Sequence, residues 1–296
     1  MTSWIYINAI IIGLSCSLAG VFLVIRHKAM LTDAISHAVL PGLVLAFLLT
    51  GSRNTSAMLT GAFVFGILCI VLIDWLRDRL RIADDASTGI VFTSLFALGI
   101  ILVSRYAGQT DLDQECVLHG ELLLSAFRRI SFLGLNIPAT FLTGTFTLLG
   151  VLIVLFAAYR PFLLTSFQPQ YAATMGFSIA AWNYVVTGMA SAVTVISFEA
   201  VGAILVIALM VVPAATAWII SKRLPELLWK TALISIAGSI VGVSYGIYAN
   251  ISIAGSIAFT LGVIFLITAL IKKKIGAVSM KKHHQSAIHN QFSNNQ

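Results

Sequence analysis

The fold is decided by residues 4–50, which read WIYINAIIIGLSCSLAGVFLVI (4–25), RHKA (26–29) and MLTDAISHAVLPGLVLAFLLT (30–50). Each apolar stretch is long enough for a helix to cross about 30 Å of hydrocarbon, which takes about 20 residues. The short polar segment between them carries Arg26 and Lys28. Two such helices joined by a basic turn predict a protein that crosses the membrane repeatedly.

Composition supports this class over the whole chain. Of its 296 residues, 59% are hydrophobic and 10% are charged, with a mean hydropathy of +0.98. Soluble domains average about 25% charged residues, so a water-soluble globular protein is excluded. Further spans are predicted at 57–76, 87–104, 132–158, 181–198, 200–220, 231–249 and 253–271. We therefore expect an all-α transmembrane bundle of about nine helices over residues 1–271, followed by a disordered, basic, His-containing cytoplasmic tail at 272–296.

Basic residues gather after spans one, three, seven and nine. They are Arg26, Lys28, Arg77, Arg79, Arg81, Lys222, Arg223, Lys230, Lys272, Lys273, Lys274, Lys281 and Lys282. The positive-inside rule places these loops in the cytoplasm and the N-terminus outside. The net charge of +7 then reflects membrane orientation. No basic patch interleaved with aromatic residues indicates a nucleic-acid surface, so we expect contact with membrane lipid and none with nucleic acid.

Asp33 and His37 are the ionisable pair that calls for a function. Four residues apart, they project from one face of a predicted helix. Each charge inside a bilayer costs roughly 2.5–3.5 kcal/mol on insertion scales, so such groups mark ion paths or buried contacts. Carboxylate oxygen and imidazole nitrogen are ligands that first-row divalent metals accept. The alternative is a structural role, in which Asp33 interacts with the positive end of its helix.

Residues that shape the helices include Pro41, Gly42 and Pro213. Proline removes a backbone hydrogen bond and kinks a helix, and glycine allows close approach, so packing kinks are expected at both sites. A bend that aims His37 at the transport axis is the functional alternative. Glu199 is predicted at the outer end of the seventh span as an interfacial residue, with a role as outer metal ligand left open.

The cytoplasmic segment 159–180 predicts a short helix. Pro169 suits a helix first turn and Gly176 a helix end. It is either an ordinary interfacial helix or a docking helix for a cytoplasmic partner. The chain has no GxxxxGK[ST] phosphate loop and no membrane-hydrolase motif. We therefore expect a transporter subunit, not an enzyme, whose energy comes from a partner or an ion gradient.

Four segments in order resemble one family, the membrane permease subunits of ATP-binding-cassette (ABC) importers for manganese, zinc and iron. They are DAISHAVLPG (33–42), DLDQECVLHGEL (111–122), LLTSFQPQYAATMG (163–176) and FEAVGAILVIALMVVPAATA (198–217). The resemblance covers residues 1 to about 271. Two positions depart from it: Gln168 stands where many members carry Asp, and His119 where an aromatic residue is usual. His119 is interpreted as a neutral substitution, with a metal role as the alternative.

The resemblance implies partners and roles in the bacterial cytoplasmic (inner) membrane. Two permease subunits, identical or homologous, form a central path driven by cytoplasmic ABC ATPases and supplied by an extracytoplasmic metal-binding protein. Asp33 and His37 match positions proposed to line that path. The ATPase-coupling segment matches residues 165–176, with Ser166, Gln168, Tyr171, Ala172 and Gly176 as its candidate residues.

Two other functions remain open. A secondary transporter driven by a proton or sodium gradient could use Asp33 and His37 as a proton relay, although its repeated halves are not evident here. An ABC permease for a metal chelate would have no clear need for bare metal ligands. In the leading interpretation the transported divalent metal is manganese, zinc or iron, and no cofactor is permanently bound.

Overall fold

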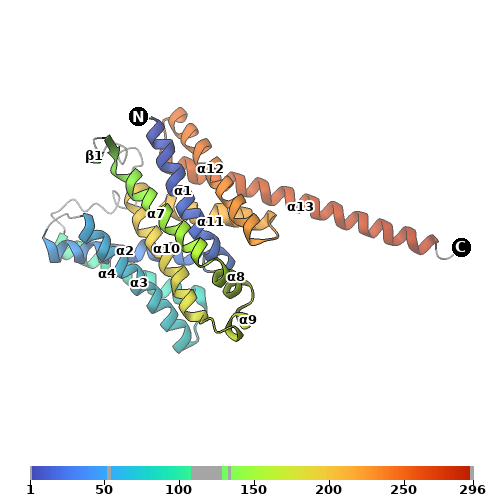
Figure 1. Cartoon of the computed structure of the whole chain (residues 1–296), viewed down its shortest axis with the longest axis horizontal. Helices are drawn as coiled ribbons and strands as arrows, with labels where there is room; N and C mark the ends of the chain where they lie inside the picture. Colours follow the sequence, from blue (N-terminus) through green and yellow to red (C-terminus); the bar gives the residue numbers. More distant parts are fainter. Residues whose placement is uncertain (1, 52–54, 108–128, 133–134, 294–296) are drawn as a thin grey trace.

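The computed structural model describes residues 2–51, 55–107, 129–132 and 135–293, and this part of the chain is a bundle of long helices (Figure 1). Nine helices within it are long and apolar enough to span a membrane, which confirms the predicted class. These helices are α1 (Thr2–Ile25), α2 (Met30–Thr50), α3 (Thr55–Leu80), α4 (Asp84–Leu102), α7 (Ala139–Ala157), α10 (Ile179–Val201), α11 (Ala203–Ile220), α12 (Leu224–Ala249) and α13 (Ile253–Ser293).

Shorter elements fill two of the connections. On one side of the bundle, α4 continues as a single π-helical turn, η1 (Val103–Ala107), and the strands β1 (Arg129–Phe132) and β2 (Leu135–Pro138) form an antiparallel hairpin before α7. The fifth span was predicted to begin at residue 132, but the helix begins at Ala139. Strand pairing takes up the backbone of 135–138, and Pro138, with ψ of 135°, stands just outside the helix.

The centre of the bundle is α1, which packs on α7, α10, α11 and α12. Its close approach to α11 depends on Gly20, because a Cβ atom there would lie 1.9 Å from the Met210 carbonyl oxygen. A similar contact joins α2 to α3, where a Cβ on Gly42 would lie 2.4 Å from the carbonyl oxygen of Gly61. Membrane helices use small residues in this way to bring their backbones together.

The outer helices carry the apolar surface expected of a membrane protein. On α7, Phe146, Ile153 and Phe156 are 69%, 66% and 81% exposed. On α13, Phe259 and Leu270 are 67% and 62% exposed. A contiguous apolar exterior of this extent suits lipid or another membrane helix rather than water.

Contacts between loops place the basic segments at one end of the bundle. The turn after α1 contacts α8 (Tyr159–Phe167) and α3 through Arg26 and Lys28. The end of α11, which leads into the loop before α12, lies beside α8, because Phe167 of α8 stacks on Trp218 of α11 with ring centroids 6.3 Å apart. Lys272 of α13 donates to the Ile219 carbonyl oxygen at the same end. Figure 1 shows α8 and α9 (Pro169–Thr174) at the end opposite β1, and the positive-inside rule assigns their end to the cytoplasm.

The last helix is longer than the sequence predicts. Residues 272–293 continue α13 as one helix that projects away from the bundle (Figure 1), where disorder was expected from residue 272. No proline interrupts this stretch, so nothing in its backbone forces the helix to end. The division into a membrane domain at 1–271 and a cytoplasmic tail at 272–296 stays a prediction.

Candidate functional site

The predicted pair meets on the surface of α2. His37 Nε2 lies 3.4 Å from Asp33 Oδ1, as the spacing of four residues predicts. Asp33 belongs to the first helical turn, where the positive end of the helix dipole favours a carboxylate. The side chains are 27% exposed for His37 and 35% for Asp33, so both can be reached from outside this subunit. The separation is long for a hydrogen bond, which leaves lone pairs on both groups free.

Aromatic side chains of α4 hold the imidazole in place. The ring of His37 stacks on Phe92 at 5.7 Å and meets Phe96 edge-on at 5.0 Å. Both phenylalanines are half-buried. One side of the imidazole is therefore covered by apolar rings, and its other side is open. This arrangement orients the imidazole while its nitrogen atoms stay available to a ligand.

Two groups from one subunit do not complete a metal site. Within the described residues, no cluster of three or more His, Cys, Asp or Glu side chains is placed to hold a metal ion. His119 lies outside the described residues. Glu199 lies in the last turn of α10, because that helix runs on to Val201 and ends at Gly202, whose φ of 80° suits glycine. Glu199 therefore belongs to α10 and not, as expected, to the next span, and its role as an interfacial residue or outer metal ligand stays a prediction.

The predicted bends coincide with tight helix contacts. Pro41 lies inside α2 and Pro213 inside α11, and both are buried. A Cβ on Gly99 of α4 would lie 3.0 Å from the Pro41 ring, and Gly42 contacts α3. Close packing of α2 is thus observed at Pro41 and Gly42, and a kink that aims His37 stays a prediction, as does one at Pro213.

The predicted coupling segment, 165–176, runs over two short helices, the end of α8 and all of α9. Sequence indicated only the second, α9, which begins at Pro169 as expected and ends before Gly176, where φ is 83°. The first, α8, is fixed to the bundle by Phe162, which is fully buried between Phe22 of α1 and Trp182 of α10 at centroid distances of 4.9 and 5.5 Å. An aromatic residue three positions after the start of the predicted 159–180 segment was the signal for α8.

The other face of this segment is open. Tyr171 and Met175 are 52% and 59% exposed, and Gln168 is exposed at the start of α9. Ala172 is fully buried beneath them. Ser166 accepts a hydrogen bond from Arg26 Nε at 3.1 Å. Of the candidate coupling residues, Gln168, Tyr171 and Gly176 are therefore free to meet a partner, while Ser166 and Ala172 face the bundle.

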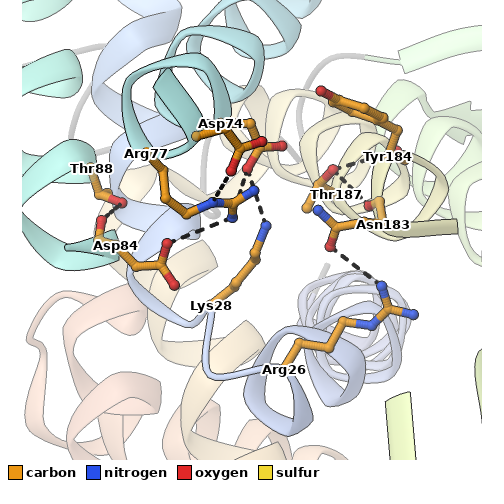
Figure 2. Close-up of polar contacts among 10 residues, drawn as sticks. Arg26, Lys28, Asp74, Arg77, Asp84, Thr88, Asn183, Tyr184 and Thr187 are labelled. Carbon is orange, nitrogen blue, oxygen red and sulfur yellow. Dashed lines mark hydrogen bonds and ion pairs between the residues drawn. The ribbon is translucent and has the colours of Figure 1, made fainter. Parts of the chain in front are cut away.

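Sequence reasoning missed a charged cluster beside this segment (Figure 2). Asp74 of α3 is 4% exposed and lies 3.4 Å from Lys28 Nζ and 3.0 Å from Arg77 Nη1. Arg77 also contacts Asp78 at 2.9 Å and Asp84 at 3.6 Å. A carboxylate inside a predicted span, one turn before basic residues, was the signal. The cluster joins the α1–α2 turn to α3 and α4.

A separate cavity of about 600 Å³ lies between α7, α10 and α3. Its walls include Phe146, Val151, Val185 and Met189. It has no charged or imidazole lining residue, so it is an apolar groove and not a second metal site.

Comparison with known proteins agrees with this architecture. The model of the ABC 3 transport family (ABC-3) matches residues 1–272. The manganese transport system membrane protein MntD of Bacillus subtilis (strain 168) is 38% identical over 280 residues, 94% of this chain and 95% of that protein. The zinc transport system membrane protein TroD of Treponema pallidum (strain Nichols) is 35% identical over 278 residues, 94% and 76% of the two chains.

A solved structure is also similar. The structure of PsaBC from Streptococcus pneumoniae in complex with Fab superposes with a TM-score of 0.74 at 28% identity, covering 90% of each chain. The family match and the structural likeness therefore agree over nearly the whole membrane part. This chain belongs to the ABC 3 transport family.

Proposed function

We propose that this chain is the permease subunit of an ABC importer that carries manganese, zinc or iron across the bacterial inner membrane, and that Asp33 and His37 line its path. The observation that carries the proposal is their geometry. Two metal-ligand groups lie 3.4 Å apart on a membrane helix, partly exposed and ordered by aromatic contacts. The chain is a transport subunit and not an enzyme, so ATP hydrolysis belongs to a separate partner.

The ligand set suits transient binding. A carboxylate and a neutral imidazole accept first-row divalent ions without the closed thiolate cage of a structural zinc site. A second permease subunit, identical or homologous, would supply further ligands across the shared path. Because imidazole must be neutral to ligate, protons compete with the metal. Relatives named for manganese and for zinc each match 94% of this chain, which supports a small divalent ion as cargo.

The cytoplasmic partner is proposed to meet α8 and α9. The exposed Tyr171 and Met175 form an apolar tip on a segment that Phe162 anchors firmly. Such a tip fits a groove on an ABC ATPase, and movement of that ATPase would then reach the bundle through α8. An extracytoplasmic metal-binding protein is proposed to deliver the ion to the opposite end.

The test is ATP-driven uptake by the complex of this chain with its second permease, ATPase and binding protein in vesicles. Manganese, zinc and iron are supplied singly and in competition. Uptake that needs ATP and saturates for one of them supports the proposal. Uptake that continues without ATP but stops when the proton or sodium gradient collapses would contradict it in favour of a secondary transporter. Uptake of a chelate alone would favour a chelate permease.

A further inference from the structure

All three guanidinium nitrogens of Arg26, the first residue after α1, donate hydrogen bonds to other elements, and two of them donate to the coupling segment. Nη2 donates to Thr165 Oγ1 at 2.8 Å and Nε to Ser166 Oγ at 3.1 Å, both on α8. Nη1 donates to Asn183 Oδ1 on α10 at 3.4 Å (Figure 2). One side chain thus joins the end of α1 to two elements that follow it by about 140 and 157 residues.

Every acceptor in this contact is neutral. Burial lowers the pKa of Arg26 from its usual value, and within the described residues no carboxylate lies within ion-pair distance of it. Nearby Lys28 and Arg77, by contrast, each contact a carboxylate. A partly buried guanidinium gains most when its fixed fork of donors is matched by well-placed acceptors. The contact is therefore specific for arginine in this place.

The turn that carries Arg26 is tightly built. His27 adopts a left-handed φ of 57°, Lys28 N donates to Leu23 O at 2.8 Å and His27 N donates to Val24 O at 3.1 Å. This pair of bonds is the Schellman arrangement that ends a helix. Leu31 N then donates back to Lys28 O at 3.0 Å, so the turn passes directly into α2. A displacement of Arg26 is passed on to α2, because the turn has little freedom to absorb it.

The two long side chains of this turn reach in different directions (Figure 2). Arg26 contacts α8 and α10, while Lys28 contacts Asp74 of α3. Asp33, the first member of the candidate metal pair, follows Lys28 by five residues on α2. The turn therefore lies directly between the coupling segment and the candidate metal pair.

We propose that Arg26 is a positioning residue for transport, which transmits the position of the coupling segment α8–α9 through the 26–29 turn to Asp33 and His37 on α2. This inference rests on the proposed function. In it, Arg26 touches neither metal nor ATPase. It makes α2 move together with α8, so that ATP hydrolysis by the partner changes the positions of Asp33 and His37.

The experiment measures metal ions taken up per ATP hydrolysed by the reconstituted complex. Arg26→Gln keeps a neutral polar side chain but loses the charge and the fork. We expect the complex to assemble and hydrolyse ATP, and uptake per ATP to fall about tenfold, the scale of losing one charge-assisted hydrogen bond. Arg26→Lys, which keeps the charge as a single point donor, should recover part of the ratio. Arg79→Gln, at an exposed arginine of the same end, should leave it unchanged.

The outcomes separate the two proposals. If wild-type complex shows no ATP-driven uptake, the proposed function fails. If wild type is coupled and Arg26→Gln keeps the same ratio, only the role of Arg26 fails. Should Arg26→Gln not give a folded complex, Thr165→Val decides, since it preserves volume and removes one acceptor on α8. An unchanged ratio in Thr165→Val then overturns the proposal, and a lowered ratio supports it.

Discussion

Two groups of charged side chains lie near the start of α2. In the group around Asp74 the carboxylate is paired with two cations, whereas the pair of Asp33 and His37 has no further charged partner among the residues that the structure describes. Asp74, at 4% exposure, is enclosed by Lys28 and Arg77. Asp33 and His37 are about a third exposed and face each other at 3.4 Å. Within the described ranges, no further charged side chain lies within ion-pair distance of either. A carboxylate saturated by its own chain holds helices together, whereas an unsaturated pair at a reachable surface is available to a ligand.

Removing either member of the unsaturated pair should have the largest effect on function. In Asp33→Ala or His37→Ala we expect metal uptake to fall about a hundredfold or more, since even outer-shell changes at metal sites cost 10–100-fold. Assembly with the ATPase should be unchanged, because neither group is enclosed. Uptake in vesicles and co-purification measure both. Asp85→Ala, at an exposed carboxylate of α4, is the control, and normal uptake in both test variants would refute the path assignment.

Removing the enclosed carboxylate should instead weaken the fold. Asp74→Ala leaves Lys28 and Arg77 without their shared partner, at a cost of about 3 kcal/mol in the free energy of unfolding. Thermal unfolding of the purified subunit would show it. Asp78→Ala removes another contact of Arg77, but the Asp78 side chain is 67% exposed, so we expect a much smaller loss of stability than in Asp74→Ala. If Asp74→Ala and Asp78→Ala lowered the free energy of unfolding equally, burial of the Asp74 carboxylate would not distinguish the two groups.

The aromatic contacts of His37 should have a smaller effect on metal affinity. Phe96→Leu keeps an apolar side chain but removes the edge-on contact at 5.0 Å. Aromatic pairs contribute about 0.5–1.5 kcal/mol, so the half-saturating metal concentration for uptake should rise about two- to tenfold. Leu98→Val, at an exposed position of the same helix, tests whether any change in α4 does the same. An unchanged half-saturation in Phe96→Leu would show that the ring does not orient His37.

The smallest effect on stability is expected from a change in the 26–29 turn, which joins α1 to α2. His27 has a φ of 57°, a conformation that costs a residue with a Cβ atom roughly 1–2 kcal/mol. Glycine avoids this strain, but it loses more conformational entropy on folding, so only part of that free energy is recovered. His27→Gly should therefore stabilise the subunit by about 0.5 kcal/mol, seen as a rise in Tm of about 1–2 °C. His27→Ala keeps the strain and should give no rise. A lower Tm for glycine than for alanine would mean that the imidazole itself stabilises the turn.

The sequence predicted local features well and distant contacts poorly. The bounds of α2 and the end of α9 just before Gly176 followed from apolar length and glycine placement, which act within a few residues. The 3.4 Å approach of Asp33 and His37 followed from helical spacing. These features need no knowledge of the rest of the chain.

Long-range contacts had no such local signal. Arg26, Lys28 and Arg77 were interpreted only as marks of membrane orientation, yet each has a specific partner. Helix α8 was missed because its stability comes from Phe162 packing on α1 and α10. The start of α7 was misplaced because strand pairing overrides the apolar pattern at 135–138. In each case the deciding partner lies elsewhere in the sequence or in another element.

The facing glycines of α2 and α3 have a geometric consequence for the metal pair. At Gly42 and Gly61 the two backbones meet without interlocking side chains of these residues. The crossing point can therefore act as a pivot about which α2 tilts relative to α3. Asp33 stands nine residues away along α2, a lever arm of about 13 Å. A tilt of about 10° at the pivot would swing that carboxylate by about 2 Å, enough to separate a metal ion from its ligand at the bond lengths of such sites.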